Sequence, residues 1–138
     1  MTCKQEKPQD TGFVRALMYE ITALLDDLVS DGTEGSIDLR GLPMLEEDKK
    51  QLEKVLGRGE VDARVTVAGE TEIWETSYSG VWWIRHKGAG DRILSDQIVV
   101  TTMPDILMTH PSDAKAAYER LQTTIDSERL KEEEGETS

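Results

Sequence analysis

The feature that most constrains the fold is the stretch from Glu72 to Lys87, which reads EIWETSYSGVWWIRHK. It contains all three tryptophans of a 138-residue chain in which aromatic residues make up only 5%. Two extended runs meet in it at Ser79-Gly80, a pair of turn-forming residues. Because tryptophan contributes most when it is buried or docked, we expect these runs to form either the centre of the core or a surface that binds a partner.

The segments around this stretch have the alternating pattern of strands with one solvated face. Apolar and polar residues alternate from Val61 to Val67, and Ala68-Gly69 can turn the chain into the next strand. Residues 81–85 and 92–102 are two further strand candidates, and 36–39 is a short one. Because consecutive strands with short connections usually lie side by side, the pattern predicts an antiparallel meander of three to four strands plus a short strand.

Three segments have helical periodicity instead, with apolar residues three and four positions apart. The first runs from Thr11 to Asp31, the second from Glu46 to Leu56, and the third from Pro111 to about Ser127. Asp10 or Thr11 is the expected cap of the first helix and Ser112 that of the third. The apolar stripe of the third helix consists of Ala114, Ala117, Tyr118, Leu121 and Ile125.

This order of elements indicates an α+β fold, a mostly antiparallel sheet with about three helices packed on one face. We expect a flexible N-terminus over residues 1–10 and a single α+β domain over residues 11–127. The charged segment 128–138 has almost nothing to bury, which predicts a disordered acidic tail.

Charge and hydropathy exclude several classes of partner. The chain has 28 acidic and 16 basic residues, a formal net charge of −12. Nucleic-acid and anionic-membrane binders need clustered Lys and Arg, so we expect no nucleic-acid partner. No apolar run approaches the roughly 20 residues that cross a bilayer, so we expect no membrane insertion. A single cysteine, Cys3, and a polar N-terminus without a hydrophobic signal region predict a cytoplasmic protein.

The residue types that usually carry catalysis are few and scattered. His86 and His110 are the only histidines, and neither has a His or Cys partner at metal-ligand spacing. Cys3 would be reactive only if its neighbours lowered its pKa. The chain has no phosphate-binding glycine loop and no nucleophile elbow. We therefore expect no catalytic residues, no metal and no cofactor, and a protein that is not an enzyme.

Four segments of the chain, in order, resemble motifs of one protein family. Residues 75–85, ETSYSGVWWIR, resemble the signature of the HupH/HyaF family, bacterial proteins encoded with nickel–iron uptake hydrogenases. The segments 35–43 (GSIDLRGLP), 56–61 (LGRGEV) and 100–107 (VTTMPDIL) resemble three further motifs of that family. Within residues 75–85, Ser79 stands where the family commonly has proline.

The resemblance implies a non-catalytic accessory protein or chaperone in hydrogenase expression and maturation. Its partner would be a hydrogenase subunit precursor, in particular the iron–sulfur small subunit, or another maturation protein. Tryptophan, tyrosine and arginine dominate binding hot spots, so we expect the partner-binding residues to be Trp74, Glu75, Tyr78, Gly80, Trp82, Trp83 and Arg85.

Strand geometry adds a prediction about the three tryptophans. Trp82 and Trp83 point to opposite faces of one strand, so we expect at least one tryptophan to be partly exposed. A free sheet edge would offer a second mode of binding, because an extended peptide can add a strand to it. The sequence also leaves a homodimer open.

Two functions of other classes stay open at this point. A small metal- or cluster-handling protein of the same pathway would use Cys3, His86 or carboxylates. A hydrolase would need a pair of carboxylates, for which Glu70, Glu72 and Glu75 are the candidates, although acidic residues on strands are usually only solvated.

Overall fold

The computed structural model describes residues 12–136 and divides into two units at Pro104. The first unit holds the sheet and two α-helices, and the second, Asp105–Ser138, holds the third α-helix. The sequence predicts a single domain over residues 11–127. No helix among the described residues is long and apolar enough to cross a membrane.

The first unit is built on a five-stranded antiparallel sheet with the order β1-β5-β4-β3-β2. Strands β2, β3, β4 and β5 follow one another as a meander, and β1 pairs with β5 at the far edge. The α+β class and the antiparallel sheet are thus confirmed. The strands are β1 (Gly35–Asp38), β2 (Asp62–Thr66), β3 (Glu70–Glu75), β4 (Val81–Lys87) and β5 (Ile93–Val100).

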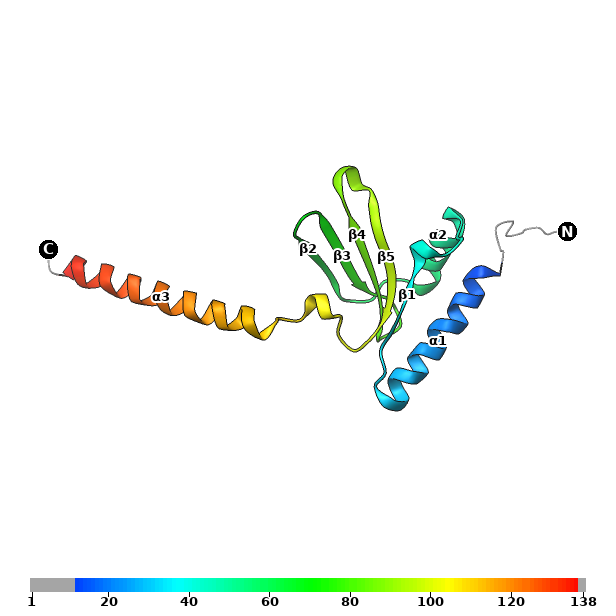
Figure 1. Cartoon of the computed structure of the whole chain (residues 1–138), viewed down its shortest axis with the longest axis horizontal. Helices are drawn as coiled ribbons and strands as arrows, with labels where there is room; N and C mark the ends of the chain where they lie inside the picture. The colour runs from blue at the N-terminus through cyan, green and yellow to red at the C-terminus, as the bar shows by residue number, and fades with distance from the viewer. Residues whose placement is uncertain (1–11, 137–138) are drawn as a thin grey trace. The chain divides into compact units, whose positions relative to one another are not determined.

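Two helices, α1 (Phe13–Asp31) and α2 (Glu46–Leu56), lie on the same side of this sheet (Figure 1). Between them the chain passes through β1 and the short 3-10 helix η1 (Leu39–Gly41). The apolar stripe of α1 supplies Val14, Leu17 and Ile21 to the core, and α2 supplies Leu52 and Leu56.

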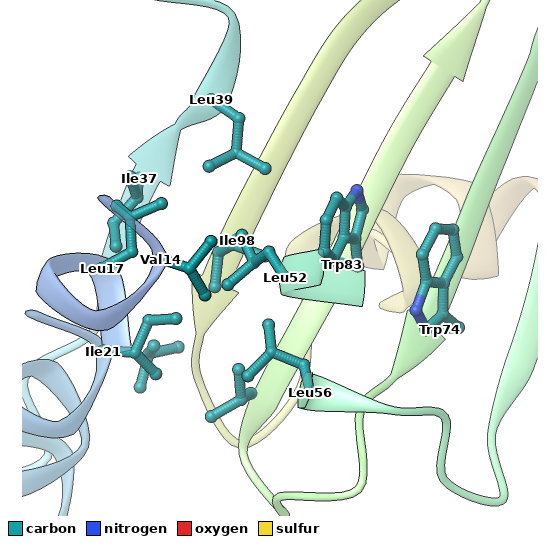
Figure 2. Close-up of a cluster of buried hydrophobic side chains, with 12 residues drawn as sticks. Val14, Leu17, Ile21, Ile37, Leu39, Leu52, Leu56, Trp74, Trp83 and Ile98 are labelled. Carbon is teal, nitrogen blue, oxygen red and sulfur yellow. The ribbon is translucent and has the colours of Figure 1, made fainter. Parts of the chain in front are cut away.

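The core is organised by a row of side chains that crosses the sheet. Ile37 of β1 pairs with Ile98 of β5, Ile98 with Trp83 of β4, and Trp83 with Trp74 of β3. Because directly paired residues point to the same face of a sheet, these four side chains form one continuous apolar strip. Figure 2 shows Leu52 beside Trp83, so the inner faces of α1 and α2 close over the strip.

Glycines end the helices of the first unit, as the sequence indicates. Gly32 has a positive φ of 78° and donates its backbone N–H to the carbonyl of Leu28, which stops α1. Gly57 follows α2 with a φ of 65°. At its start, α1 has Gly12 as the N-cap without a side-chain cap, and the predicted caps Asp10 and Thr11 lie outside the described residues.

The second unit contains the 3-10 helix η3 (Asp105–Leu107) and α3 (Pro111–Glu136). His110, not Ser112, caps the start of α3. Its carbonyl accepts the N–H of Ala114, and its ring Nδ1 accepts the N–H of Ser112. Pro111 then occupies the first helical position, which needs no N–H partner.

The helix α3 differs from its prediction in length and in burial. It continues to Glu136 instead of ending near Ser127, since Glu, Lys, Arg and Leu are strong helix formers. All side chains from 111 to 135 are exposed. The predicted stripe of Tyr118, Leu121 and Ile125 is therefore uncovered, with exposed fractions between 50 and 62%.

Candidate functional site

The two tryptophans on the helix side of the sheet form a stacked pair. Trp74 and Trp83 face each other across β3 and β4, with ring centroids 5.5 Å apart and planes inclined by 13°. The guanidinium carbon of Arg58 lies 3.9 Å from the centroid of the Trp74 ring, within cation–π distance. Both indoles are at most 1% exposed, so this pair supports the surface from beneath and does not itself contact solvent.

A buried carboxylate joins this pair to α2. Asp96 of β5 is fully buried and accepts hydrogen bonds from the indole N–H of Trp83 and from Nε of Arg85, the latter at 3.2 Å. Two residues of α2 complete the cluster: Lys49 Nζ lies 3.4 Å from Asp96, and Glu53 accepts from Arg85 at 3.1 Å. The sheet and α2 are thereby connected by charge as well as by apolar contacts.

This cluster determines the ionisation of Arg85. Burial of the guanidinium by itself lowers its pKa, but the hydrogen bonds and negative charges of Asp96 and Glu53 outweigh that effect and hold the pKa above its usual value. Arg85 therefore stays charged at every physiological pH. Its side chain is only 12% exposed, so the guanidinium acts inside the fold.

The third tryptophan lies on the opposite face of the sheet. Trp82 pairs with Glu75 of β3 and Val99 of β5, and its indole N–H donates to the carbonyl of Thr101 at 3.1 Å. It is 3% exposed. The prediction that Trp82 and Trp83 point to opposite faces is confirmed by these pairings. The prediction that at least one tryptophan is partly exposed is wrong, because all three are at most 3% exposed.

The connection between β3 and β4 is the part of the predicted site that reaches the surface. Thr76 is buried there, and its hydroxyl donates to the carbonyl of Val81 and accepts the N–H of Tyr78. The N–H of Val81 returns to the carbonyl of Tyr78 at 3.0 Å, which closes a tight turn. We call residues 75–80 the β3–β4 turn; Tyr78, 48% exposed, projects from it.

The segment 56–61 is hydrogen-bonded along this turn. The N–H of Ser77 donates to the carbonyl of Leu56, that of Gly59 to Glu75, and that of Glu75 to Val61, at 2.7 to 2.9 Å. This close pairing explains the glycine at position 59. A Cβ added to Gly59 would lie 2.6 Å from the carbonyl oxygen of Thr76, where no real Cβ fits.

The other side of the turn is held by the end of β5. Gly80, with a φ of 91°, accepts the N–H of Thr101 on its carbonyl, and its own N–H lies 3.4 Å from the carboxylate of Glu75. The hydroxyl of Thr101 donates to Glu34, just before β1, at 2.6 Å. Segments that resembled separate family motifs in the sequence therefore meet at one place in the fold.

The predicted partner-binding residues thus fall into two groups. Glu75, Tyr78 and Gly80 lie on the β3–β4 turn at or near the surface. The other four, Trp74, Trp82, Trp83 and Arg85, are buried or nearly so and hold the sheet beneath the turn together.

Residues that sequence reasoning did not single out complete the arrangement: Asp96, Thr101, Glu34, Lys49 and Glu53. A signal for Asp96 was present, because it stands two and four positions before Ile98 and Val100 and so faces the core with them. Thr101, by contrast, could not be identified from the sequence pattern. Its role depends on contacts with Gly80 and Glu34, which are distant in the chain.

The candidate metal ligands have structural partners where they are described. Nδ1 of His86 lies 2.7 Å from the hydroxyl of Thr71 in the neighbouring strand, and His110 caps α3. Within residues 12–136 no three His, Cys, Asp or Glu side chains form a group suited to an ion. Cys3 lies outside the described residues.

The candidate hydrolase carboxylates also have structural partners. Glu70 and Glu72 form ion pairs with Arg64, at 3.1 and 3.8 Å, and Glu72 also pairs with Lys87. Glu75 pairs across the strands with Trp82, so it points to the sheet face opposite Trp74 and Trp83. The three carboxylates therefore do not converge on one point.

Comparison with known proteins identifies the family to which these motifs belong. The family described as "HupH hydrogenase expression protein, C-terminal conserved region" matches residues 14–127. The chain belongs to this family. Three of the four segments that suggested it, 56–61, 75–85 and 100–107, are hydrogen-bonded to one another at the β3–β4 turn.

Individual proteins with hydrogenase expression/formation names are also similar to this chain. The chain is 30% identical over 98 residues to the hydrogenase expression/formation protein HupH of Rhodobacter capsulatus, covering 71% of this chain and 36% of that protein. It is 29% identical over 90 residues to HoxQ of Azotobacter vinelandii, also a hydrogenase expression/formation protein, covering 65% and 32%. The chain thus spans about a third of the length of these relatives.

A solved structure of a family member has the same fold. The hydrogenase expression protein HupH from Thiobacillus denitrificans superimposes with a TM-score of 0.81 at 31% sequence identity. The match covers 85% of this chain and 98% of the other.

The buried charge cluster yields a stability prediction. Replacing Asp96 with Ala should lower the free energy of unfolding by about 3–5 kcal/mol, because Arg85 and the Trp83 indole lose a buried acceptor. Urea titration followed by tryptophan fluorescence measures this. The control is Asp62→Ala, which removes an exposed ion pair with Arg58 and should change stability by less than about 1 kcal/mol. Equal losses for the two variants would contradict the role assigned to Asp96.

The close approach at Gly59 yields a second prediction. Gly59→Ala should destabilise the first unit by about 1–3 kcal/mol, because the new methyl collides with backbone that cannot move away cheaply. Gly41→Ala is the matched control, since the nearest atom there is a side-chain oxygen at 3.9 Å. Thermal unfolding of both variants tests this, and a Gly59→Ala protein as stable as the control would disprove the tight pairing.

Proposed function

We propose that this chain is a non-catalytic accessory protein or chaperone in the expression and maturation of nickel–iron uptake hydrogenase. It binds a hydrogenase subunit precursor in the cytoplasm, with the iron–sulfur small subunit as the first candidate and another maturation protein as the second. Family membership supports the pathway, and the surface of the first unit supports binding.

The observation that carries this proposal is the construction of the β3–β4 turn. The turn is hydrogen-bonded on one side to the segment 56–61 and on the other to Thr101. An exposed tyrosine on so fixed a backbone loses little conformational freedom when it binds, and tyrosine is a preferred binding anchor. Tyr78, with Glu75 and Gly80 beside it, is therefore the proposed contact point.

The buried members of the predicted site have a supporting role in this proposal. Trp74, Trp83 and Arg85 fix the strands that carry the turn, and Trp82 ties β4 to Thr101. Replacing any of these tryptophans with Ala would remove a fully packed side chain, so a loss of binding would not separate contact from folding.

Tyr78 allows that separation because it is half exposed. Tyr78→Ala should reduce recovery of the hydrogenase small subunit in affinity purification by roughly tenfold or more, while the unfolding midpoint stays unchanged. The matched control is Tyr19→Ala, which removes a tyrosine of α1 that is 65% exposed. Equal recovery with the two variants would refute the turn as the contact surface, and wild-type protein recovering no hydrogenase or maturation protein would refute the function.

Metal analysis distinguishes this function from metal or cluster handling by the same chain. An accessory protein that only binds polypeptide should carry nickel and iron far below one ion per chain, even after incubation with either ion and desalting. Elemental analysis of the purified full chain measures this. One tightly held ion per chain, lost in a Cys3→Ser or His86→Ala variant, would favour the metal-handling function.

A further inference from the structure

The exposed helix α3 is a feature that the proposed subunit binding does not use. It is 26 residues long, and every side chain from 111 to 135 is exposed. Most of the stability of helices in proteins comes from packing of an apolar face. The exposed apolar face of α3 therefore fits a role in binding a partner surface.

The apolar face is confined to one side of the helix. Its residues Ala114, Tyr118, Leu121 and Ile125 recur at spacings of four and three, the repeat that aligns side chains along one stripe. Ala117 widens the stripe toward its N-terminal end. Leu130 follows Leu121 by nine residues, about two and a half turns, and so points to the opposite side.

The charges on α3 are distributed unevenly along its length. Residues 111–125 contain two acidic and two basic side chains, Asp113, Glu119, Lys115 and Arg120, and are electrically balanced. Residues 126–136 contain six acidic and two basic side chains, a net charge of 2 − 6 = −4. The acidic residues of this part are Asp126, Glu128, Glu132, Glu133, Glu134 and Glu136.

We propose that α3 is a dimerisation helix that pairs antiparallel, along its apolar stripe, with α3 of a second copy of this chain. An antiparallel pair centred near Leu121 would place each acidic end beside the N-terminus of the opposite helix, where the helix dipole is positive. A parallel pair would bring the two acidic ends together. The distribution of charge along α3 therefore favours the antiparallel direction.

The stripe is also self-complementary in charge. Because residues 111–125 are neutral overall, two copies of this part meet without net repulsion, as a two-fold symmetric contact requires. Small side chains at 114 and 117 allow the helices to approach, and Tyr118, Leu121 and Ile125 fill the contact. This inference does not rest on the proposed subunit binding, since the purified chain alone is enough to test it.

Sedimentation of the purified full chain over a concentration series tests the dimer. The wild type should sediment as a monomer–dimer equilibrium, and Leu121→Glu should raise its dissociation constant roughly a hundredfold or more, because two carboxylates enter the seam. Leu130→Glu is the control: it adds the same charge to an equally exposed leucine (61%) on the opposite side and should change the constant less than about threefold.

The proposal fails if the wild type stays monomeric throughout the series, or if the two variants weaken the dimer equally. It also fails if a dimer forms only after a hydrogenase subunit is added. Circular dichroism of both variants at high dilution shows whether helix content follows dimerisation. An α3 whose helix content does not fall as the dimer dissociates would contradict the dependence on pairing.

Cross-linking tests the direction of pairing. In a Cys3→Ser background, Ala114→Cys and Glu128→Cys place single thiols seven residues before and after Leu121, in line with the apolar stripe. Antiparallel pairing predicts that a disulfide forms in an equimolar mixture of the two variants and not in either alone. Self-linking of each variant, with no mixed product, would show parallel pairing and overturn the proposed geometry.

Discussion

The packing of Trp74 on Trp83 is the interaction on which the rest of the first unit depends. The two residues are direct partners across β3 and β4, and they continue a row that starts at Ile37 and passes through Ile98. A shift of register by one residue would turn Trp83 to the other face and bring Trp82 into its place. The stacked pair therefore fixes the register of the central strands, and with it the position of the β3–β4 turn.

The charge cluster next to this pair fixes the helix above it. A buried Asp96 is unfavourable unless its charge is compensated, and the compensation comes from Arg85 on the sheet and Lys49 on α2. Because Arg85 also pairs with Glu53, α2 is tied to β4 and β5 by directional bonds as well as by Leu52 and Leu56. The helix α2 leads directly into the segment 56–61. Its position therefore also fixes this segment, which is hydrogen-bonded along the β3–β4 turn.

These connections explain why a family can be detected from separated short motifs. Gly59 permits the close backbone approach of the segment 56–61, Gly80 permits the positive φ of the turn, and Thr101 connects the turn to Glu34. The three residues are far apart in sequence, yet Gly80 belongs to the β3–β4 turn and Gly59 and Thr101 are hydrogen-bonded to it from its two sides. At the centre of these connections, Tyr78 projects from a backbone that is hydrogen-bonded on both sides.

Local periodicity was enough to locate the helices and strands, because apolar residues recur every third or fourth position along a one-sided helix and every second position along a one-sided strand. It placed α2 at Glu46–Leu56 and set Trp82 and Trp83 on opposite faces, and the motifs indicated the family. Only the tertiary structure decided which surfaces are covered. It buried all three tryptophans and left Tyr78 outside. Burial depends on contacts between residues distant in the chain, such as Trp82 with Thr101, and a local pattern carries no information about which distant segment will arrive.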